Sequence, residues 1–212
     1  MPHFSVKSMQ IGPVMVNCYL LVNEDDKKVV VVDPGGDPAV VSSHIEDLGC
    51  EPVAVLLTHG HFDHTGAVEY LRRELKIPVL AYKRANEYLL DTRMNLSAYC
   101  DQNVVIENVE YLDDKDRIQL VGNPDIILDV IYTPGHTTDS VIFYSAKDAV
   151  AFVGDTIFKG SIGNDQYPGG NGVELRRSII EKIFSLPDDT VLCSGHSEQT
   201  TVGDEKRRYG FQ

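Results

Sequence analysis

The segment Thr58-His59-Gly60-His61-Phe62-Asp63-His64 places three histidines and one aspartate close together in the chain. It directly follows a short apolar run, which is typical of a strand that is covered on both faces. Residues i and i+2 of an extended chain point the same way, so His59 and His61 can contact one metal ion together. Asp63 and His64 lie farther on, where the chain turns into a helix, and can face a neighbouring ion. Because imidazole suits zinc and iron, and a carboxylate can bridge two cations, the segment predicts a metal site.

Three more candidate ligands also come directly after apolar strands. These strands are expected at 126–132, 149–153 and 190–193, and they lead to His136, Asp155 and His196. Strand ends place side chains at one edge of a sheet core, so four such ends can converge there. One histidine after a strand is usually an ordinary polar loop residue, but the combination indicates a metal site. The remaining histidines, His3 and His44, lack this setting, and we expect them at a strand edge and on a helix surface.

Strands and helices are expected to alternate in two halves of the chain. The other strands are expected within 3–22 and at 28–32, 53–57, 78–82, 118–121 and 140–145. The first helix has Asp37 as a plausible N-cap, Pro38 at its first position and Gly49 beyond its end. Later helices are expected from near Thr65, within 84–117, over 173–185 with Ile180 facing inward, and after Gly203. This pattern fits two sheets that face each other with helices outside.

Composition excludes some classes of function. The chain has 212 residues, of which 42% are apolar and 24% charged, as expected for one globular domain. Its 19 basic and 32 acidic residues give a formal net charge of −13. A nucleic-acid-binding protein usually carries a basic patch, and the short basic clusters here have acidic neighbours. We therefore expect a small-molecule substrate and no nucleic-acid partner.

The cysteines and the apolar runs indicate a cytoplasmic protein. Cys18, Cys50, Cys100 and Cys193 are far apart and form no C-x-x-C pair, which predicts buried thiols in a reducing compartment. No signal-peptide pattern begins the chain, and no apolar run approaches the ~20 residues of a transmembrane helix. We expect no membrane partner, and the sequence does not indicate an oligomeric state.

These segments resemble the metallo-β-lactamase-fold hydrolases, and most closely the short hydroxyacylglutathione hydrolase (glyoxalase II)-like branch. The similarity spans nearly the whole chain, and the H-x-H-x-D-H signature is highly specific to the fold. Further matching segments are Asn17-Cys18-Tyr19-Leu20, Val32-Asp33-Pro34-Gly35-Gly36, Thr133 to Thr137, Gly154 to Phe158, Gly160 to Gly163 and Ser194-Gly195-His196. The resemblance implies an α+β fold, a four-layer αββα sandwich, over a single domain of residues 1–212. We expect no C-terminal helical domain of the kind that binds glutathione in full-length glyoxalase II.

The resemblance also implies a site for two divalent metal ions, most simply zinc, with iron or manganese as alternatives. One ion would be held by His59, His61 and His136, the other by Asp63, His64 and His196, with Asp155 bridging them. True β-lactamases of this fold generally lack a bridging aspartate at this position. Flavodiiron-type oxygen reductases carry a glutamate where His61 stands.

The chain departs from its relatives in the loop that follows Gly160-Ser161-Ile162. It reads Gly163-Asn164-Asp165-Gln166-Tyr167 where related sequences usually continue Gly-Arg-Thr/Ser-Asp. A lysine and a tyrosine that contact glutathione in full-length glyoxalase II fall near Asn164 and Gln166. The carrier of the acyl group therefore stays open, and candidate substrate contacts are Lys159, Tyr167 and Asn95.

The resemblance favours hydrolysis of a thioester or ester, such as an S-hydroxyacylglutathione, by attack of a metal-bound hydroxide. Asp63 and Asp155 would orient this nucleophile as well as bind metal. Iron-dependent persulfide dioxygenation, and hydrolysis of lactones or phosphodiesters on the same core, remain as alternatives. A complete ligand set argues against a non-catalytic metal-binding module.

Overall fold

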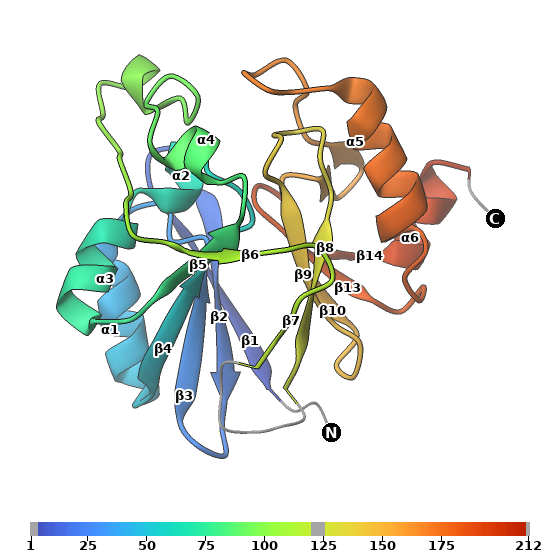
Figure 1. Cartoon of the computed structure of the whole chain (residues 1–212). Coiled ribbons are helices and arrows are strands. Elements are labelled where there is room, and N and C mark those ends of the chain that lie inside the picture. Colours follow the sequence, from blue (N-terminus) through green and yellow to red (C-terminus); the bar gives the residue numbers. More distant parts are fainter. Residues whose placement is uncertain (1–3, 120–125, 211–212) are drawn as a thin grey trace.

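Two six-stranded sheets lie face to face in the computed structural model, which describes residues 4–119 and 126–210 (Figure 1). The strand order is β1-β2-β3-β4-β5-β6 in the first sheet and β14-β13-β10-β9-β8-β7 in the second. Each sheet is mixed. In the first, β1 to β3 pair antiparallel and β3 to β6 pair parallel. In the second, β10 and β13 are the parallel pair.

The first sheet and its helices come from the N-terminal half of the chain. Its elements are β1 (Ser5–Ile11), β2 (Val16–Asn23), β3 (Lys28–Val32), α1 (Pro38–Leu48), β4 (Glu51–Leu56), α2 (Phe62–Thr65), α3 (Val68–Leu75), β5 (Val79–Tyr82), α4 (Asn86–Leu89), the 3₁₀ turn η1 (Ser97–Tyr99) and β6 (Glu110–Leu112). The second half contributes β7 (Arg117–Ile118), β8 (Leu128–Tyr132), β9 (Val141–Ser145), β10 (Val150–Gly154), β11 (Ile157–Phe158), β12 (Ser161–Ile162), α5 (Gly172–Ser178), the π-helical segment η2 (Ile179–Ile183), β13 (Val191–Ser194), β14 (Thr200–Thr201) and α6 (Val202–Arg208).

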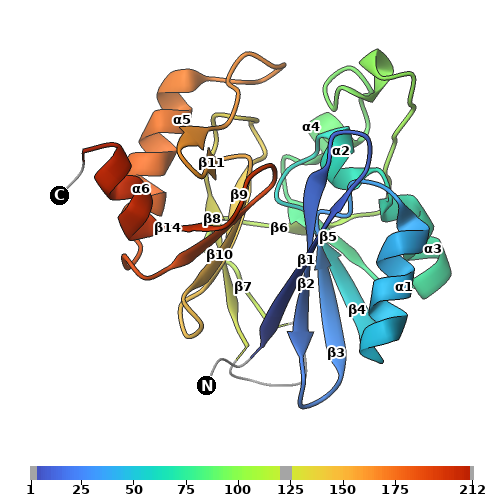
Figure 2. The same cartoon turned by 180° about the vertical axis from the view of Figure 1, so that it is seen from behind.

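Alternating side chains of the central strands fill three separate cores. In β2, Leu20 packs under the helices α1 and α3, whereas Leu21 packs between the two sheets. In β9, Phe143 faces the first sheet and Ile142 faces the helices of the second. Both faces of these strands are covered, which explains why their sequences are continuous apolar runs. The layers are therefore helix, sheet, sheet and helix, and Figures 1 and 2 show the helices on the two outer sides. The expected αββα sandwich is confirmed.

Several local expectations need correction. Asp37 lies in the left-handed region with φ 44°, and its side chain does not cap α1 but accepts a hydrogen bond from Gly12 N at 2.8 Å. Ile180 is 46% exposed, because the wider π-helical segment keeps Leu175, Ile179 and Ile183 on the buried face. Cys100 is exposed, unlike the other three cysteines.

Other expectations agree with the structure or concern residues that it does not describe. Helix α1 begins at Pro38 and ends before Gly49, as predicted, and His44 is exposed on its surface. His3 and the end of the strand expected at 118–121 lie outside the described residues. In the described part of the chain, each helix is too short or too polar to cross a lipid bilayer.

Candidate metal centre

The seven predicted ligands lie beyond the C-terminal ends of four strands: the H-x-H-x-D-H group follows β4, and His136, Asp155 and His196 follow β8, β10 and β13. Strands β8 and β10 are both antiparallel to β9, and β13 is parallel to β10, so the C-terminal ends of these three strands lie on the same side of the second sheet. The loop after β4 reaches these strand ends, where Thr58 O accepts a hydrogen bond from Val141 N at 2.9 Å. The loops of both sheets thus meet at one place.

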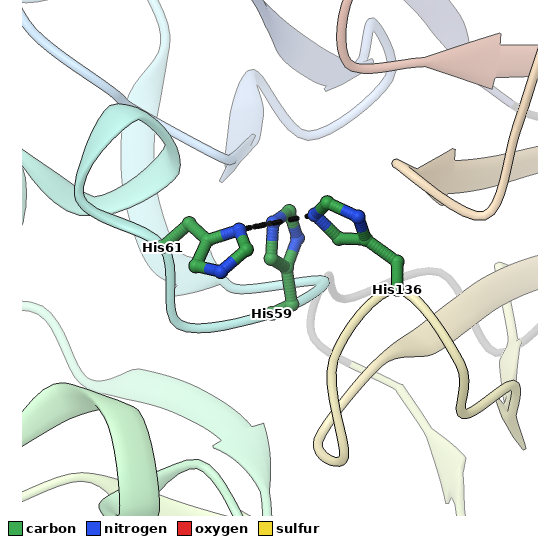
Figure 3. Close-up of side chains that lie close together, drawn as sticks. All are labelled: His59, His61 and His136. Atoms are coloured by element: carbon green, nitrogen blue, oxygen red, sulfur yellow. Dashed lines mark hydrogen bonds between the residues drawn. The ribbon is translucent and has the colours of Figure 1, made fainter. Parts of the chain in front are cut away.

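His59, His61 and His136 form the first cluster, with their rings turned toward one another (Figure 3). His61 Nδ1 lies 3.1 Å from His59 Nε2 and 3.0 Å from His136 Nε2. All three side chains are buried. Burial, with the neighbouring His136 ring adding to it, lowers the pKa of His61 to about 3, and burial lowers the pKa of His59 and His136 as well. The rings are therefore neutral and can offer nitrogen lone pairs.

Hydrogen bonds on the outer nitrogens fix which lone pairs face inward. His136 Nδ1 donates to the carbonyl oxygen of Asn164 at 2.7 Å, which leaves the lone pair on Nε2. The Thr58 hydroxyl donates to Asp33 Oδ2 at 2.6 Å, so its oxygen can accept from His59 Nδ1 at 3.2 Å. Nε2 of His59 then also carries a lone pair. Such outer partners are the usual support of metal-binding histidines.

Asp63, His64 and His196 form the second cluster. His196 Nε2 lies 3.0 Å from Asp63 Oδ2, and His64 Nε2 lies 3.8 Å from the same oxygen. Burial opposes a positive charge on His64, but Asp155, Asp33 and Asp63 together raise its pKa well above the ordinary value. The protein therefore stabilises positive charge at this place.

Asp155 lies between the two clusters. Its Oδ1 is 3.4 Å from His64 Nε2, and its Oδ2 is 3.7 Å from both His136 Nε2 and His196 Nε2. Burial opposes ionisation of Asp155, but His64, His136 and His196 lower its pKa, so the carboxylate is charged. One side chain thus contacts ligands of both sets.

Unpartnered atoms at this centre test whether the residues fit metal ions. His64 Nε2 and Asp155 Oδ1 are buried and have no hydrogen-bond partner within residues 4–119 and 126–210. Buried polar atoms of this kind are costly unless something else satisfies them. Two ligands about 2.0–2.2 Å from one tetrahedral zinc ion lie about 3.4 Å apart, which matches the 3.4 Å between these two atoms. The donor set, its spacing and its unsatisfied atoms all fit bound cations.

Asp33 is a functional residue that the sequence reasoning did not single out. It follows β3 directly, and its buried carboxylate accepts hydrogen bonds from Thr58 N at 2.8 Å and His64 Nδ1 at 2.9 Å. The available signal was its position after an apolar strand, a position that the seven predicted ligands share. The segment Val32-Asp33-Pro34-Gly35-Gly36 matches the family, but the resemblance gave Asp33 no role of its own.

Gly195 is required by the close approach of the chain to the centre. A Cβ atom on this residue would lie 2.2 Å from Asp155 Oδ1 and 2.6 Å from His64 Cε1. Any side chain here would displace one of these groups. Only glycine lets β13 lead into His196 along this path.

A pocket of about 600 Å³ opens beside the centre and is lined by five of the seven ligands. Tyr167, a predicted substrate contact, lines it, with its ring centroid 5.8 Å from that of His61. The two other predicted substrate contacts lie elsewhere. Asn95 is buried, and its amide donates to the carbonyls of Tyr88 and Val104, so we assign it a structural role. Lys159 pairs with Glu198 and does not line the pocket.

Comparisons with known proteins agree with this arrangement. The model of the metallo-beta-lactamase superfamily matches residues 11–196. A probable metallo-hydrolase of Bacillus subtilis, YqgX, is 34% identical over 206 residues, which cover 97% of this chain and 96% of that protein. The hydroxyacylglutathione hydrolase GloC of Haemophilus influenzae is 30% identical over 199 residues, and the match covers 92% of each protein.

Solved structures are similar over the same length. The crystal structure of the BLEG-1 B3 metallo-beta-lactamase has a TM-score of 0.90 and 35% identity, covering 96% of this chain and 97% of that one. The structure of TTHA1623 in a di-iron-bound form has a TM-score of 0.84 and 30% identity, covering 95% and 98%. The family model, the relatives and the ligand clusters lead to one conclusion: the chain belongs to the metallo-β-lactamase superfamily and has its metal-binding hydrolase fold.

Proposed function

We propose that this protein is a hydrolase that cleaves a thioester or ester with two divalent metal ions, most simply zinc. The observation that carries the proposal is the place of Asp155, whose two oxygens face ligands of both clusters. A carboxylate in this position is suited to join two cations. Asp63 and His196 complete a second set of ligands on the other side of it.

Under this proposal, each ion has its own set of side chains. His59, His61 and His136 would hold one ion, while Asp63, His64 and His196 would hold the other. Asp155 would serve both. When bound, two such cations polarise the carbonyl of the substrate and lower the pKa of a water from ~15.7 to about 7, which makes it a nucleophile at neutral pH.

The carboxylates of the site have a separate task in orienting that water. Burial opposes ionisation of Asp63, but His64 and the hydrogen bond from His196 lower its pKa. An ionised carboxylate can only accept hydrogen bonds. Asp63 and Asp155 both line the pocket, so they can receive the O–H groups of a water there and hold its oxygen toward the substrate. His196 Nε2 lies 3.0 Å from Asp63 Oδ2, close enough for the two atoms to serve the same cation.

The relatives support the reaction class and leave the metal open. One of them is named as a hydroxyacylglutathione hydrolase, and a similar structure holds two iron ions. Zinc has the simplest chemistry for hydrolysis, since it needs no control of its oxidation state. The pocket beside the ligands and the net charge of −13 favour a small molecule over a nucleic acid as substrate.

Elemental analysis of the purified protein, followed by assays of the same sample, tests the proposal. About two zinc-like ions per chain and release of free thiol from simple thioesters are expected. S-Lactoylglutathione, N-acetylcysteamine thioesters and a lactone form the substrate panel. One iron per chain with oxygen uptake on a persulfide would instead indicate a dioxygenase. Two bound ions without cleavage of any thioester or ester would refute the proposed reaction.

A further inference from the structure

The pocket wall beyond the metal ligands is almost entirely apolar. Its large side chains come from segments far apart in the sequence, namely Val14, Phe62, Leu96, Tyr99, Phe158 and Tyr167. Among the described residues that line the pocket, Asn164 is the only amide, and its Oδ1 already accepts a hydrogen bond from Gln166 N at 2.8 Å. Apolar walls of this kind bind ligands through burial of apolar surface.

The mouth of the pocket exposes apolar side chains to water. Tyr99 is 70% exposed and Val14 is 47% exposed, and Met15 beside Val14 is 54% exposed. These residues belong to two loops, one between β1 and β2 and one that contains η1. Neighbouring exposed apolar residues at the opening of a pocket mark a surface that a ligand covers.

Cations are missing from this wall. No lysine or arginine of the described residues lines the pocket. The lysine nearest in sequence to Phe158, Lys159, is paired with Glu198, and Arg176 donates to the carbonyl of Gly172 at 2.9 Å. A glutathione carrier would bring carboxylates to this surface, and they would find no lysine or arginine to pair with among the described lining residues. The formal net charge of −13, which two divalent cations offset only in part, would also repel an anionic substrate.

We infer that the substrate is an uncharged and largely apolar thioester or ester, and not a glutathione conjugate. This inference rests on the proposed hydrolytic function and adds the class of acyl carrier to it. The acyl chain lies against Phe62, Leu96 and Tyr99 or against Phe158 and Tyr167, and either surface excludes water from it. Each added methylene of the acyl group should then raise kcat/KM by about fourfold until the pocket is filled.

Matched substrate pairs test the inference on the zinc-loaded full chain. The same hexanoyl group is presented on N-acetylcysteamine, which is neutral, and on glutathione, which is anionic. We expect kcat/KM for the neutral thioester to be greater by about tenfold or more. We also expect a rise from the acetyl to the hexanoyl member of the neutral series. Equal or faster cleavage of the glutathione thioester, or no dependence on acyl length, would overturn the inference.

A charge placed at the mouth of the pocket gives a second test. Tyr99→Lys introduces a cation at an exposed position, so it should raise kcat/KM for the glutathione thioester severalfold and lower it for the neutral one. Tyr111→Lys is the matched control, because Tyr111 is exposed on β6, outside the pocket lining, and the change in net charge is the same. An identical response of the two variants would overturn the inference.

Binding of thioethers separates this inference from the proposed reaction. S-Hexylglutathione and S-hexyl-N-acetylcysteamine cannot be hydrolysed, and calorimetry reports their affinities directly. Tighter binding of the neutral thioether supports the inference even if no thioester is cleaved, in which case only the proposed reaction fails. Tighter binding of S-hexylglutathione would overturn the inference even if thioesters are cleaved.

Discussion

Asp33 Oδ2 lies 2.9 Å from His64 Nδ1, and both side chains are buried. The carboxylate accepts a hydrogen bond from Nδ1–H and thereby turns the Nε2 atom of His64 toward Asp63 and Asp155. Asp33→Asn keeps the volume but can present an NH₂ group to Nδ1, which favours the ring form with its proton on Nε2. We expect metal affinity to fall by about 10–100-fold, measured by competition with a chromogenic chelator.

The control for this substitution is Asp47→Asn on the exposed surface of α1. It removes the same charge from the protein without touching the centre. Unchanged affinity in Asp47→Asn together with a loss in Asp33→Asn would assign the effect to the contact with His64. Equal affinities in both variants would show that Asp33 does not support the site.

Asp155 should decide whether the protein holds one ion or two. Asp155→Asn removes the carboxylate that faces both clusters, so we expect the metal content to fall by at least one ion per chain. With one cation lost and the water no longer oriented, kcat/KM should fall by at least about a hundredfold. Elemental analysis and the thioester assay measure the two effects, and circular dichroism verifies the fold. Full metal content with full activity would contradict the role given to Asp155.

Gly195→Ala should damage the centre without changing any ligand. The added methyl group would lie 2.2 Å from Asp155 Oδ1, so either the carboxylate or the chain has to shift. We expect lower metal content and lower activity. Gly49→Ala is the control, because Gly49 has φ 60° and nothing within 4 Å of its Cβ position. That variant should lower the melting temperature through backbone strain and leave the metal content unchanged.

Asp139 should make stability depend on pH. Its carboxylate is buried and has no hydrogen-bond partner in the described part of the chain. Burial raises its pKa from 3.8 to about 7. The nearby polar groups of Thr137 and Gly60 favour the charged carboxylate and offset only part of this rise. Between these values the folded protein retains a proton that the unfolded chain has lost. The free energy of unfolding should therefore decrease as pH rises from about 4 to about 7 and level off above that.

Asp139→Asn should remove this slope, because an amide does not titrate. The measurement is the melting temperature of both proteins across the same pH range after metal removal with a chelator. The melting temperature of the variant should therefore rise relative to that of the wild type as pH increases. A constant difference between them at every pH would mean that Asp139 titrates normally in the folded protein.

The sequence was informative about the ligands because their pattern is local. His59, His61, Asp63 and His64 occur in one segment, and the strand that precedes them is a continuous apolar run. The other ligands could be found because each also follows an apolar strand. Within the second sheet, β8, β10 and β13 converge because they end on the same side, and β4 joins them because the two sheets pack face to face.

The supporting and lining residues could not be found in the same way. Asp33 acts through a contact with a residue 31 positions away, and its local sequence has the composition of a turn. Asn95 is of a type that is common at the surface, yet the loop folds around it, and its amide donates hydrogen bonds to two backbone carbonyls of the loop. The pocket wall combines single side chains from several loops. Such assemblies depend on loop conformation, which neither apolar periodicity nor spacing encodes.

The ligands are divided between the two layers of the sandwich: four follow β4 in the first sheet, and three follow β8, β10 and β13 in the second. A cation held by both groups therefore cross-links the sheets without a covalent bond. Fragments that each contain one sheet would carry incomplete coordination shells. Bound metal would stabilise the pair of reassembled fragments and would add little to the stability of either fragment alone.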